Sequence, residues 1–543
     1  MSRSKKDRSR AGELTRRQFI AASAIAASAA GAVVSTPTFA FSNPANTATE
    51  VLIDPRRTIA TLDRRVFGSF LEHIGRAIYG GIYQPLTPVA DAEGFRKDTL
   101  ELVAKLHVPI VRYPGGNFVS GYNWRDGVGP KDKRPKVHER AWNSTESNQF
   151  GVDEFLAWCD RVKTLPLLAV NLGDGTPKSA AELVEYCNGA ADTTQGALRK
   201  QNGHAAPYAV QNWCLGNEMD GPWQIGHLSA VDYGKKAADA ARRMRAVDKS
   251  LTLIACGSSG PSMPTYLEWD RQVLEQCYPE VDALSLHRYY DNAGETGGDS
   301  RVFVALNLLM EQQIHEVAAT CDYVGSRLRS KKRLWLSFDE WNVWYRDRDG
   351  DGKRREAPPL IEEKYNLEDA LLVGGLLNSL VRNADRVRVA CLAQLVNVIA
   401  PILTNETSLL RQTIFYPYAW ALGHARGQVL DLHVESPAYD TAKLGKTPYV
   451  DVAGTFDADS RQSCFLLLNR DLAQPRETTL RWREAAPKQV LGAEVLTGKD
   501  LKAINTFAEP ERVVPQRFDV DPPGESLMLK LPPQSYTLLR LQS

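Results

Sequence analysis

Residues 212–218, NWCLGNE, and residues 336–342, LSFDEWN, are two short apolar segments that run into a glutamate. Both have the composition of a strand buried on both faces, which is typical of parallel sheets covered by helices. In barrels of parallel strands the active site lies at the carboxyl ends of the strands. The two segments therefore predict a parallel α/β fold with Glu218 and Glu340 at the same end.

Working outward from these segments, the chain contains eight apolar runs separated by helix-like stretches such as 98–107, 152–163 and 366–383. The pattern predicts an α/β fold, a closed (β/α)₈ TIM barrel over 64–425. An open doubly wound sheet is disfavoured because no GxGxxG or GxxxxGK[ST] loop follows any run. The runs are 66–70, 108–113, 165–172, 212–215, 251–256, 281–286, 333–338 and 387–395.

The pattern of apolar and polar residues changes after about residue 426. Short alternating segments, including YVDVAGTF, SCFLLLNR and SYTLLRLQ, are separated by Pro, Gly and Asn. This pattern predicts a C-terminal antiparallel β-sandwich, jelly-roll-like, over 426–543. A short run within 49–62 precedes the first barrel strand and is a candidate to complete that sandwich.

The first forty residues resemble a twin-arginine signal peptide. A basic segment leads through Arg16 and Arg17 into an Ala-rich apolar stretch, with small residues before an expected cut after Ala40. The alternatives are a basic arm followed by an amphipathic helix and an uncleaved anchor. We expect a periplasmic or secreted protein with no membrane attachment after cleavage.

Charge and cysteine usage exclude several functions. Lys and Arg number 66 against 65 Asp and Glu, and the two signs are interspersed, so neither nucleic acid nor an anionic membrane is an expected partner. The eight cysteines include no CxxC pair and no Cys/His cluster, so we expect no metal site. No Ser lies in a GxSxG elbow, which disfavours a serine hydrolase.

Two glutamates facing each other across a barrel are suited to glycoside hydrolysis. One carboxyl group protonates the leaving oxygen while the other attacks the anomeric carbon, and in a retaining enzyme they lie about 5 Å apart. Taken alone, Asn217-Glu218 or Glu340-Trp341 is more simply a helix cap or a surface feature. Their shared position after two barrel strands favours the catalytic interpretation.

Further polar residues follow other runs, including Glu72-His73, Arg112 and Asn117. Glu72 and His73 have a structural alternative as a buried pair, and Arg112 as a counter-ion below the site. Both alternatives are compatible with a place in the active site.

The chain resembles glycoside hydrolase family 51, the α-L-arabinofuranosidases, over nearly all of its length after the signal. The segments that carry the resemblance are GSFLEHIGRAIYGGIY, VRYPGGNFVSGYNW, ESNQFGVDEF, CLGNEMDGPWQIGH, SLHRYYDN, SFDEWNVWY and CLAQLVNVIAPI. The resemblance implies a barrel with a C-terminal sandwich, a retaining mechanism and no cofactor. It makes Glu218 the acid/base and Glu340 the nucleophile.

By the same resemblance, a non-reducing-end α-L-arabinofuranosidase (EC 3.2.1.55) that acts on arabinose-containing plant oligo- or polysaccharides is expected. A homo-oligomer, in this family often a hexamer, is also implied. The residues implied around the terminal furanose are Glu72, Arg112, Asn117, Trp142, Asn217, Tyr289 and Gln394.

Two rival functions remain. A β-1,4-endoglucanase or xylosidase on a related barrel shares the Asn-Glu and Glu motifs but needs an open cleft or a different pocket. A carbohydrate-binding protein that has lost its chemistry usually lacks one carboxylate, and both are present here. Activity on p-nitrophenyl α-L-arabinofuranoside, compared with the β-xyloside and β-glucoside, separates these functions.

Overall fold

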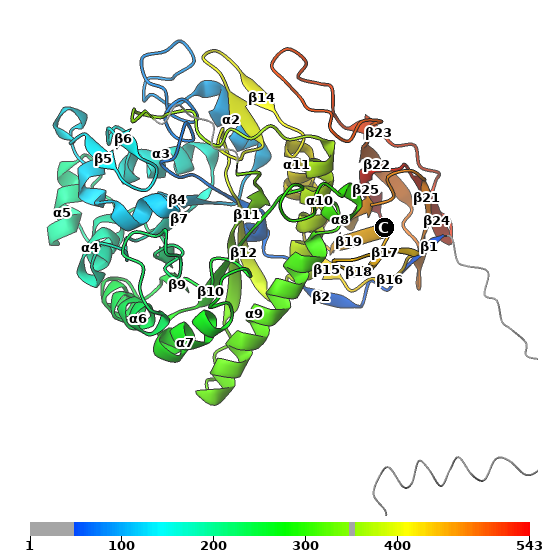
Figure 1. The fold of residues 1–543 in the computed structure, drawn as a ribbon, viewed down its shortest axis with the longest axis horizontal. Coiled ribbons are helices and arrows are strands. Elements are labelled where there is room, and N and C mark those ends of the chain that lie inside the picture. The colour runs from blue at the N-terminus through cyan, green and yellow to red at the C-terminus, as the bar shows by residue number, and fades with distance from the viewer. Residues whose placement is uncertain (1–47, 347–352) are drawn as a thin grey trace, which may run out of the picture. The chain divides into compact units, whose positions relative to one another are not determined.

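Eight parallel strands close into a barrel, as the sequence predicts, and Figure 1 shows helices around them. The computed structural model describes residues 48–346 and 353–543, so the expected signal peptide at 1–40 lies outside the described residues. In order around the barrel the strands are β3 (Gly68–Phe70), β4 (Ile110–Tyr113), β7 (Leu165–Ala169), β8 (Asn212–Leu215), β9 (Thr252–Ala255), β10 (Ala283–Tyr290), β11 (Trp335–Val343) and β12 (Val387–Leu392).

The helices lie between or after the barrel strands in the chain, and most of them bury apolar residues. In α3, for example, Phe155, Trp158 and Val162 are buried at helical spacing. None of the described helices is long and apolar enough to cross a membrane. The helices are α2 (Lys97–Leu106), α3 (Val152–Val162), α4 (Pro177–Asn188), α5 (Thr194–Gln201), α6 (Ala230–Val247), α7 (Glu268–Cys277), α8 (Ser300–Phe303), α9 (Asn307–Arg327), α10 (Leu367–Arg382) and α11 (Phe415–His424).

Strands β10 and β11 are longer than the apolar runs that predict them, and their pairing is irregular. The register between β11 and β12 shifts between Phe338 and Trp341. Successive side chains of a regular strand point to opposite faces, so a regular β11 would direct only one of Asp339 and Glu340 inward. Here both carboxylates approach Arg112 of β4, at 3.6 and 2.6 Å. The irregularity therefore brings two adjacent acidic side chains into the barrel.

The C-terminal region forms two packed sheets. Most strand pairs are antiparallel, but β1 pairs parallel with β21 because it arrives from the N-terminal side of the barrel rather than through a hairpin. One sheet contains β16 (His433–Glu435), β1 (Thr49–Ile53), β21 (Arg476–Trp482) and β24 (Ser526–Leu531). The other contains β2 (Thr58–Thr61), β15 (Gln428–Leu430), β19 (Val450–Asp457), β20 (Gln462–Asn469), β25 (Ser535–Gln542), β22 (Gln489–Leu496) and β23 (Gln516–Arg517).

Three two-stranded hairpins lie outside the barrel and outside the two large sheets. One of them, β5 with β6, carries Trp142 in its connecting loop. The hairpins are β5 (Val137–Glu139) with β6 (Ser144–Glu146), β13 (Ile402–Thr404) with β14 (Leu409–Arg411), and β17 (Ala438–Thr441) with β18 (Gly445–Pro448).

Barrel and sandwich pack against each other within one compact unit, Thr47–Ser543. The buried carboxylate of Asp451 on β19 accepts hydrogen bonds from Arg382 and Asn378 of α10, at 2.9 and 2.8 Å, and from Arg470 at 2.8 Å. Both arginines hold the pKa of Asp451 below its ordinary value, although burial opposes them. We propose a domain boundary near residue 425, between α11 and β15.

Candidate active site

The carboxylate of Glu340 lies near the carboxyl end of β11 and is held by two strand-borne donors. Arg112 Nη1 donates to Glu340 Oε1 at 2.6 Å, and the Tyr289 hydroxyl donates to Oε2 at 2.8 Å. Arg112 is buried on β4 and Tyr289 lies on β10. The two donors fix both oxygens of Glu340 and supply a compensating positive charge.

Glu218 lies three residues beyond β8 in a left-handed turn. Its φ is +42°, which is uncommon for a residue other than glycine and is found at sites where the surrounding structure imposes the conformation. Oε1 lies 2.9 Å from His287 Nδ1, and Oε2 accepts a hydrogen bond from Trp223 Nε1 at 2.8 Å. The turn brings the carboxyl group back over the mouth of the barrel.

Glu218 and Glu340 meet at one cavity. A carboxylate oxygen of each lies within 4.8 Å of the other and of a nitrogen of His287. The cavity has a volume of about 560 Å³, large enough for a sugar residue. Of the residues expected from the sequence, the structure places seven on its wall: Glu72, Asn117, Trp142, Glu218, Tyr289, Glu340 and Gln394.

The two remaining expected residues lie beneath this wall. Arg112 Nη2 donates to Asn217 Oδ1 at 2.8 Å, and Asn217 Nδ2 in turn donates to Asn117 Oδ1 at 3.4 Å. Asn217 is almost fully buried. The structure therefore brings all nine expected residues together, with Arg112 and Asn217 supporting the side chains that face the cavity.

Glu72 lines the same cavity as Glu218 and Glu340. Its Oε1 accepts hydrogen bonds from the Phe118 backbone N–H and from Trp142 Nε1, both at 2.9 Å. A side chain at Gly116 would collide with the Glu72 carboxyl group, which explains the second glycine of the PGGN motif. Burial raises the pKa of Glu72 to about 8, so this carboxyl group is protonated at neutral pH.

Two charged residues of the site, His287 and Asp339, are absent from the set expected from the sequence. His287 Nε2 lies 3.2 Å from Asp339 Oδ1, and both side chains are buried. Burial opposes protonation of His287, but Glu340, Asp339 and Glu218 raise its pKa to about 10. Both residues stand near the ends of apolar runs in the sequence. In a regular strand, however, only one of Asp339 and Glu340 would point into the barrel, so the sequence predicts a site role for Glu340 alone.

Several further cavity residues come from loops after the barrel strands and were not predicted to line the site. Trp223 follows β8, Met263 follows β9, and Trp344 and Arg346 follow β11. Trp223 is half exposed. These four side chains therefore line the cavity together with the residues expected from the sequence.

Among the described residues, Glu218, His287 and Glu340 are close enough together to be considered as metal ligands. However, both ring nitrogens of His287 face carboxylates, at 2.9 and 3.2 Å, and a histidine with its raised pKa carries a proton on each nitrogen. An imidazolium has no lone pair for a metal ion.

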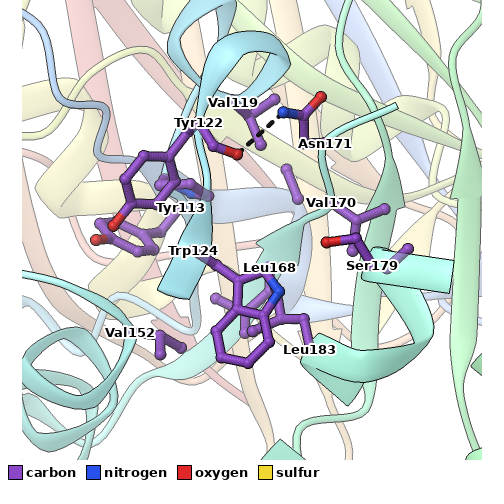
Figure 2. A pocket seen from close by; sticks show the side chains of 13 residues that line it. Tyr113, Val119, Tyr122, Trp124, Val152, Leu168, Val170, Asn171, Ser179 and Leu183 are labelled. Carbon is purple, nitrogen blue, oxygen red and sulfur yellow. Dashed lines mark hydrogen bonds between the residues drawn. The ribbon is translucent and has the colours of Figure 1, made fainter. Parts of the chain in front are cut away.

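A second cavity, drawn in Figure 2, lies in the barrel wall between β4, β7 and α4. It has a volume of about 30 Å³, the size of a single water molecule, and none of its lining residues carries a formal charge. Asn171 Nδ2 crosses its edge to donate to the Tyr122 carbonyl oxygen at 3.0 Å. This cavity is too small and too apolar to be a reaction site.

A (β/α)₈ barrel with two close carboxylates at the ends of β8 and β11 defines a glycoside hydrolase. Two family models match the chain: the α-L-arabinofuranosidase 1 domain at residues 102–302 and the α-L-arabinofuranosidase C-terminal domain at residues 339–535.

Individual relatives are consistent with this class. The chain is 45% identical, over 91% of its length and 98% of the relative, to intracellular exo-α-(1→5)-L-arabinofuranosidase 1 of Bacillus subtilis. It is 41% identical to an exo-α-(1→6)-L-arabinofuranosidase of Bifidobacterium longum, over 91% of this chain and 97% of the relative. A solved family 51 α-L-arabinofuranosidase from Bifidobacterium longum superposes with a TM-score of 0.87 at 39% identity, covering 91% of this chain and 99% of that one.

The chain belongs to glycoside hydrolase family 51, the α-L-arabinofuranosidases. It is an exo-acting, retaining hydrolase of terminal arabinofuranosyl residues. The family and the activity expected from the sequence are confirmed.

The expected periplasmic or secreted location is wrong. Four curated relatives that are 44–47% identical to the chain are named intracellular enzymes. The paired arginines and the Ala-rich stretch that suggested export lie outside the described residues. A basic, Ala-rich segment is a compositional pattern, and composition does not by itself fix a destination.

Proposed function

We propose that this enzyme uses Glu340 as its nucleophile and Glu218 as its acid/base catalyst in a double displacement. The observation that carries the proposal is the pair of carboxylate oxygens within 4.8 Å of each other at one cavity. Inverting enzymes need about 6.5–9.5 Å between their carboxyl groups to admit a water molecule. The shorter spacing suits direct attack on the anomeric carbon.

In the first step, an oxygen of Glu340 attacks the anomeric carbon and the bond to the leaving oxygen breaks. Glu218 transfers its proton to that oxygen, so the departing group leaves as a neutral alcohol. Tyr289 and Arg112 hold Glu340 in the attacking orientation. The product of this step is a covalent arabinofuranosyl-enzyme.

In the second step, the ionised Glu218 removes a proton from a water molecule that enters the vacated position. The water oxygen attacks the anomeric carbon, and the bond to Glu340 breaks. Arabinose leaves, Glu340 is a carboxylate again and Glu218 is protonated again. Two inversions give net retention of configuration.

We assign the binding of the terminal furanose to the other side chains around the cavity. The neutral carboxyl group of Glu72 offers a donor and an acceptor to sugar hydroxyl groups. Trp142 places an apolar ring beside Glu72 and donates to it. The full set is Glu72, Arg112, Asn117, Trp142, Asn217, Tyr289 and Gln394, of which Arg112 and Asn217 act from beneath the wall.

We further propose α-(1→5)-linked arabino-oligosaccharides as the preferred substrate. This proposal is supported by four relatives that are named exo-α-(1→5)-L-arabinofuranosidases. A (1→6) preference is the competing assignment, because another relative carries that name.

Two comparisons test this function. The first measures release of p-nitrophenol from the α-L-arabinofuranoside, the β-D-xyloside and the β-D-glucoside, and only the first is expected to react well. The second compares arabinose release from (1→5)- and (1→6)-linked arabinobioside, with a higher kcat/KM expected for the (1→5) isomer. Faster cleavage of the xyloside, or of the (1→6) isomer, would contradict the corresponding assignment.

A homo-oligomer, and specifically a hexamer, is also part of the proposal. It rests on the family resemblance rather than on any contact between copies. Light scattering coupled to size-exclusion chromatography tests it, with six times the chain mass of 60.2 kDa as the expected result. A monomeric mass would contradict it.

A further inference from the structure

Asp339, the residue immediately before Glu340, is a fully buried carboxylate in the centre of the barrel. Its Oδ1 accepts a hydrogen bond from Ser285 Oγ at 2.7 Å and lies 3.2 Å from His287 Nε2. Its Oδ2 accepts from Cys214 Sγ at 3.4 Å and lies 3.6 Å from Arg112 Nε. Three different strands, β4, β8 and β10, thus direct donors at one side chain that does not reach the substrate cavity.

Two chains of contacts lead from Asp339 to the two catalytic glutamates. Arg112 contacts Asp339 through Nε and Glu340 through Nη1, at 3.6 and 2.6 Å. His287 contacts Asp339 through Nε2 and Glu218 through Nδ1, at 3.2 and 2.9 Å. His287 Nδ1 also lies 3.6 Å from Glu340 Oε2. One buried carboxylate therefore touches both cations that hold the catalytic pair.

Each charged group around Asp339 lies beside a group of opposite charge. The titratable groups that face it are Arg112 on β4, Cys214 on β8, Cys256 beyond β9, His287 on β10 and Cys391 on β12. Burial raises the pKa of the three thiols, so they are neutral. Burial also opposes ionisation of Asp339, but Arg112 and His287 lower its pKa to about 2. A buried charge persists only when it is paired, as each charge is here.

We propose that Asp339 is a positioning residue that keeps His287 doubly protonated and aims it at Glu218. The imidazolium donates its Nε2 proton to Asp339 and its Nδ1 proton to Glu218 Oε1. Oε1 thus accepts from a cation, whereas Oε2 accepts from the neutral Trp223 N–H, so Oε2 is the more basic oxygen and carries the proton that Glu218 transfers. Asp339 also keeps Arg112 aligned on Glu340. This inference rests on the proposed roles of Glu218 and Glu340.

Replacing Asp339 by Asn isolates the charge, because the amide has nearly the same shape. The imidazolium then faces a neutral group at Nε2, and its proton is less strongly held. We expect His287 to lose a proton within the working range of the enzyme. Without a fixed donor at Oε1, the Glu218 proton is no longer confined to Oε2.

The decisive measurement is nuclear magnetic resonance of the full chain labelled with ¹⁵N-histidine. The chain has 9 histidines, and loss of a signal in His287→Gln assigns the resonances of His287. In the unsubstituted protein, both ring nitrogens are expected to stay protonated from about pH 5 to pH 9. In Asp339→Asn, one proton should be lost within that range. A neutral His287 at about pH 7 in the unsubstituted protein overturns the proposal, and so does an imidazolium that persists throughout in Asp339→Asn.

Asp153→Asn is the matched control. Asp153 is also a buried aspartate, and it accepts hydrogen bonds from Tyr186 and Tyr208, at 2.8 Å each, rather than from His287. The same loss of charge there should leave the His287 resonances unchanged. Movement of those resonances in Asp153→Asn would attribute the effect to a general change in the barrel and overturn the proposal.

A kinetic measurement completes the test. Because Asp339 acts partly through the proton of Glu218, its loss should reduce kcat/KM for alkyl arabinofuranosides at least about tenfold more than for p-nitrophenyl arabinofuranoside. Equal losses of kcat/KM on the two substrates would show that Asp339 has a merely structural role and would overturn the proposal. The resonance measurement does not depend on turnover. A Glu218→Ala enzyme that loses activity equally on both substrates would therefore refute the proposed function while leaving the protonation of His287 separately testable.

Discussion

Glu340 and Glu218 lie at the same cavity, but the regions that carry them are built differently. Glu340 belongs to β11, is 6% exposed in its side chain and is held by donors on two other strands. Glu218 belongs to a turn, is 12% exposed and has as one of its partners Trp223, a half-exposed side chain on the following loop. The region proposed to carry the nucleophile is therefore held by strands, whereas the region proposed to carry the acid/base catalyst is held partly by a half-exposed loop side chain.

This difference suits the two proposed catalytic tasks. A nucleophile must keep its orientation toward one carbon atom through both steps, which favours fixation on strands. An acid/base catalyst must exchange protons first with a leaving group and then with water, which requires access from outside. Substitutions at the two sites should therefore differ in size and in their dependence on the substrate.

The largest effect is expected for Glu340→Ala. Removal of the attacking carboxylate prevents formation of the covalent intermediate, and kcat should fall by a factor on the order of 10⁴ or more. Initial rates on p-nitrophenyl α-L-arabinofuranoside measure the loss. Glu101→Ala, which changes an exposed glutamate on α2, is the control. Appreciable turnover by Glu340→Ala would remove Glu340 from the role of nucleophile.

Glu218→Ala should be selective rather than uniformly inactive. A good leaving group departs without protonation, so the first step on the p-nitrophenyl substrate should survive while arabinobioside cleavage falls by about 10²–10⁴. Stopped-flow measurement should detect a burst of p-nitrophenol, and mass spectrometry should detect an arabinosyl adduct on the β11 peptide. Equal losses on both substrates would speak against the acid/base role.

Tyr289→Phe removes one donor from Glu340 and nothing from Glu218. A hydrogen bond to a charged group contributes about 1.5–3 kcal/mol, so kcat should fall by about 10- to 100-fold. The ring remains, so KM should change little. A large rise in KM with unchanged kcat would show that Tyr289 serves binding rather than support of Glu340.

Glu72→Gln tests the neutral carboxyl group in the cavity wall. The pKa of Glu72 is about 8 in the folded protein and near 4.5 in an unfolded chain, so between about pH 4.5 and 8 only the folded state holds the proton. Stability contributed by this group therefore falls as pH rises through that window. Glu72→Gln should abolish this fall, on the order of 3 kcal/mol, and calorimetric Tm differences at about pH 5 and 8 should reveal it. An identical Tm difference at both pH values would contradict a raised pKa.

The smallest effect is expected for Trp223→Phe. It keeps an aromatic ring at the cavity but removes the N–H donor to Glu218 Oε2. A partly exposed hydrogen bond contributes about 1 kcal/mol, so kcat/KM should fall by about fivefold. Comparison with Tyr289→Phe directly tests whether the acid/base region tolerates loss of a partner better than the nucleophile region. A larger loss for Trp223→Phe would reverse that comparison.

Much of the site was predictable because it depends on residue type at strand ends. Eight buried apolar runs indicate a barrel, and Glu218 and Glu340 follow two of them. The sequence places Asp339 and His287 at the ends of two strands but predicts no role for either residue, because strand alternation assumes a regular β11 and β10. Both strands are irregular at the site.

The sequence by itself determined the order of strands and helices, the family and the chemical nature of the side chains around the cavity, because these follow from local pattern and residue type. The tertiary structure decided which oxygen of each glutamate has which partner, the raised pKa of Glu72 and the paired charges of Asp339, Arg112 and His287. These properties arise from burial and from distances between residues far apart in the chain, and neither quantity exists before the barrel closes.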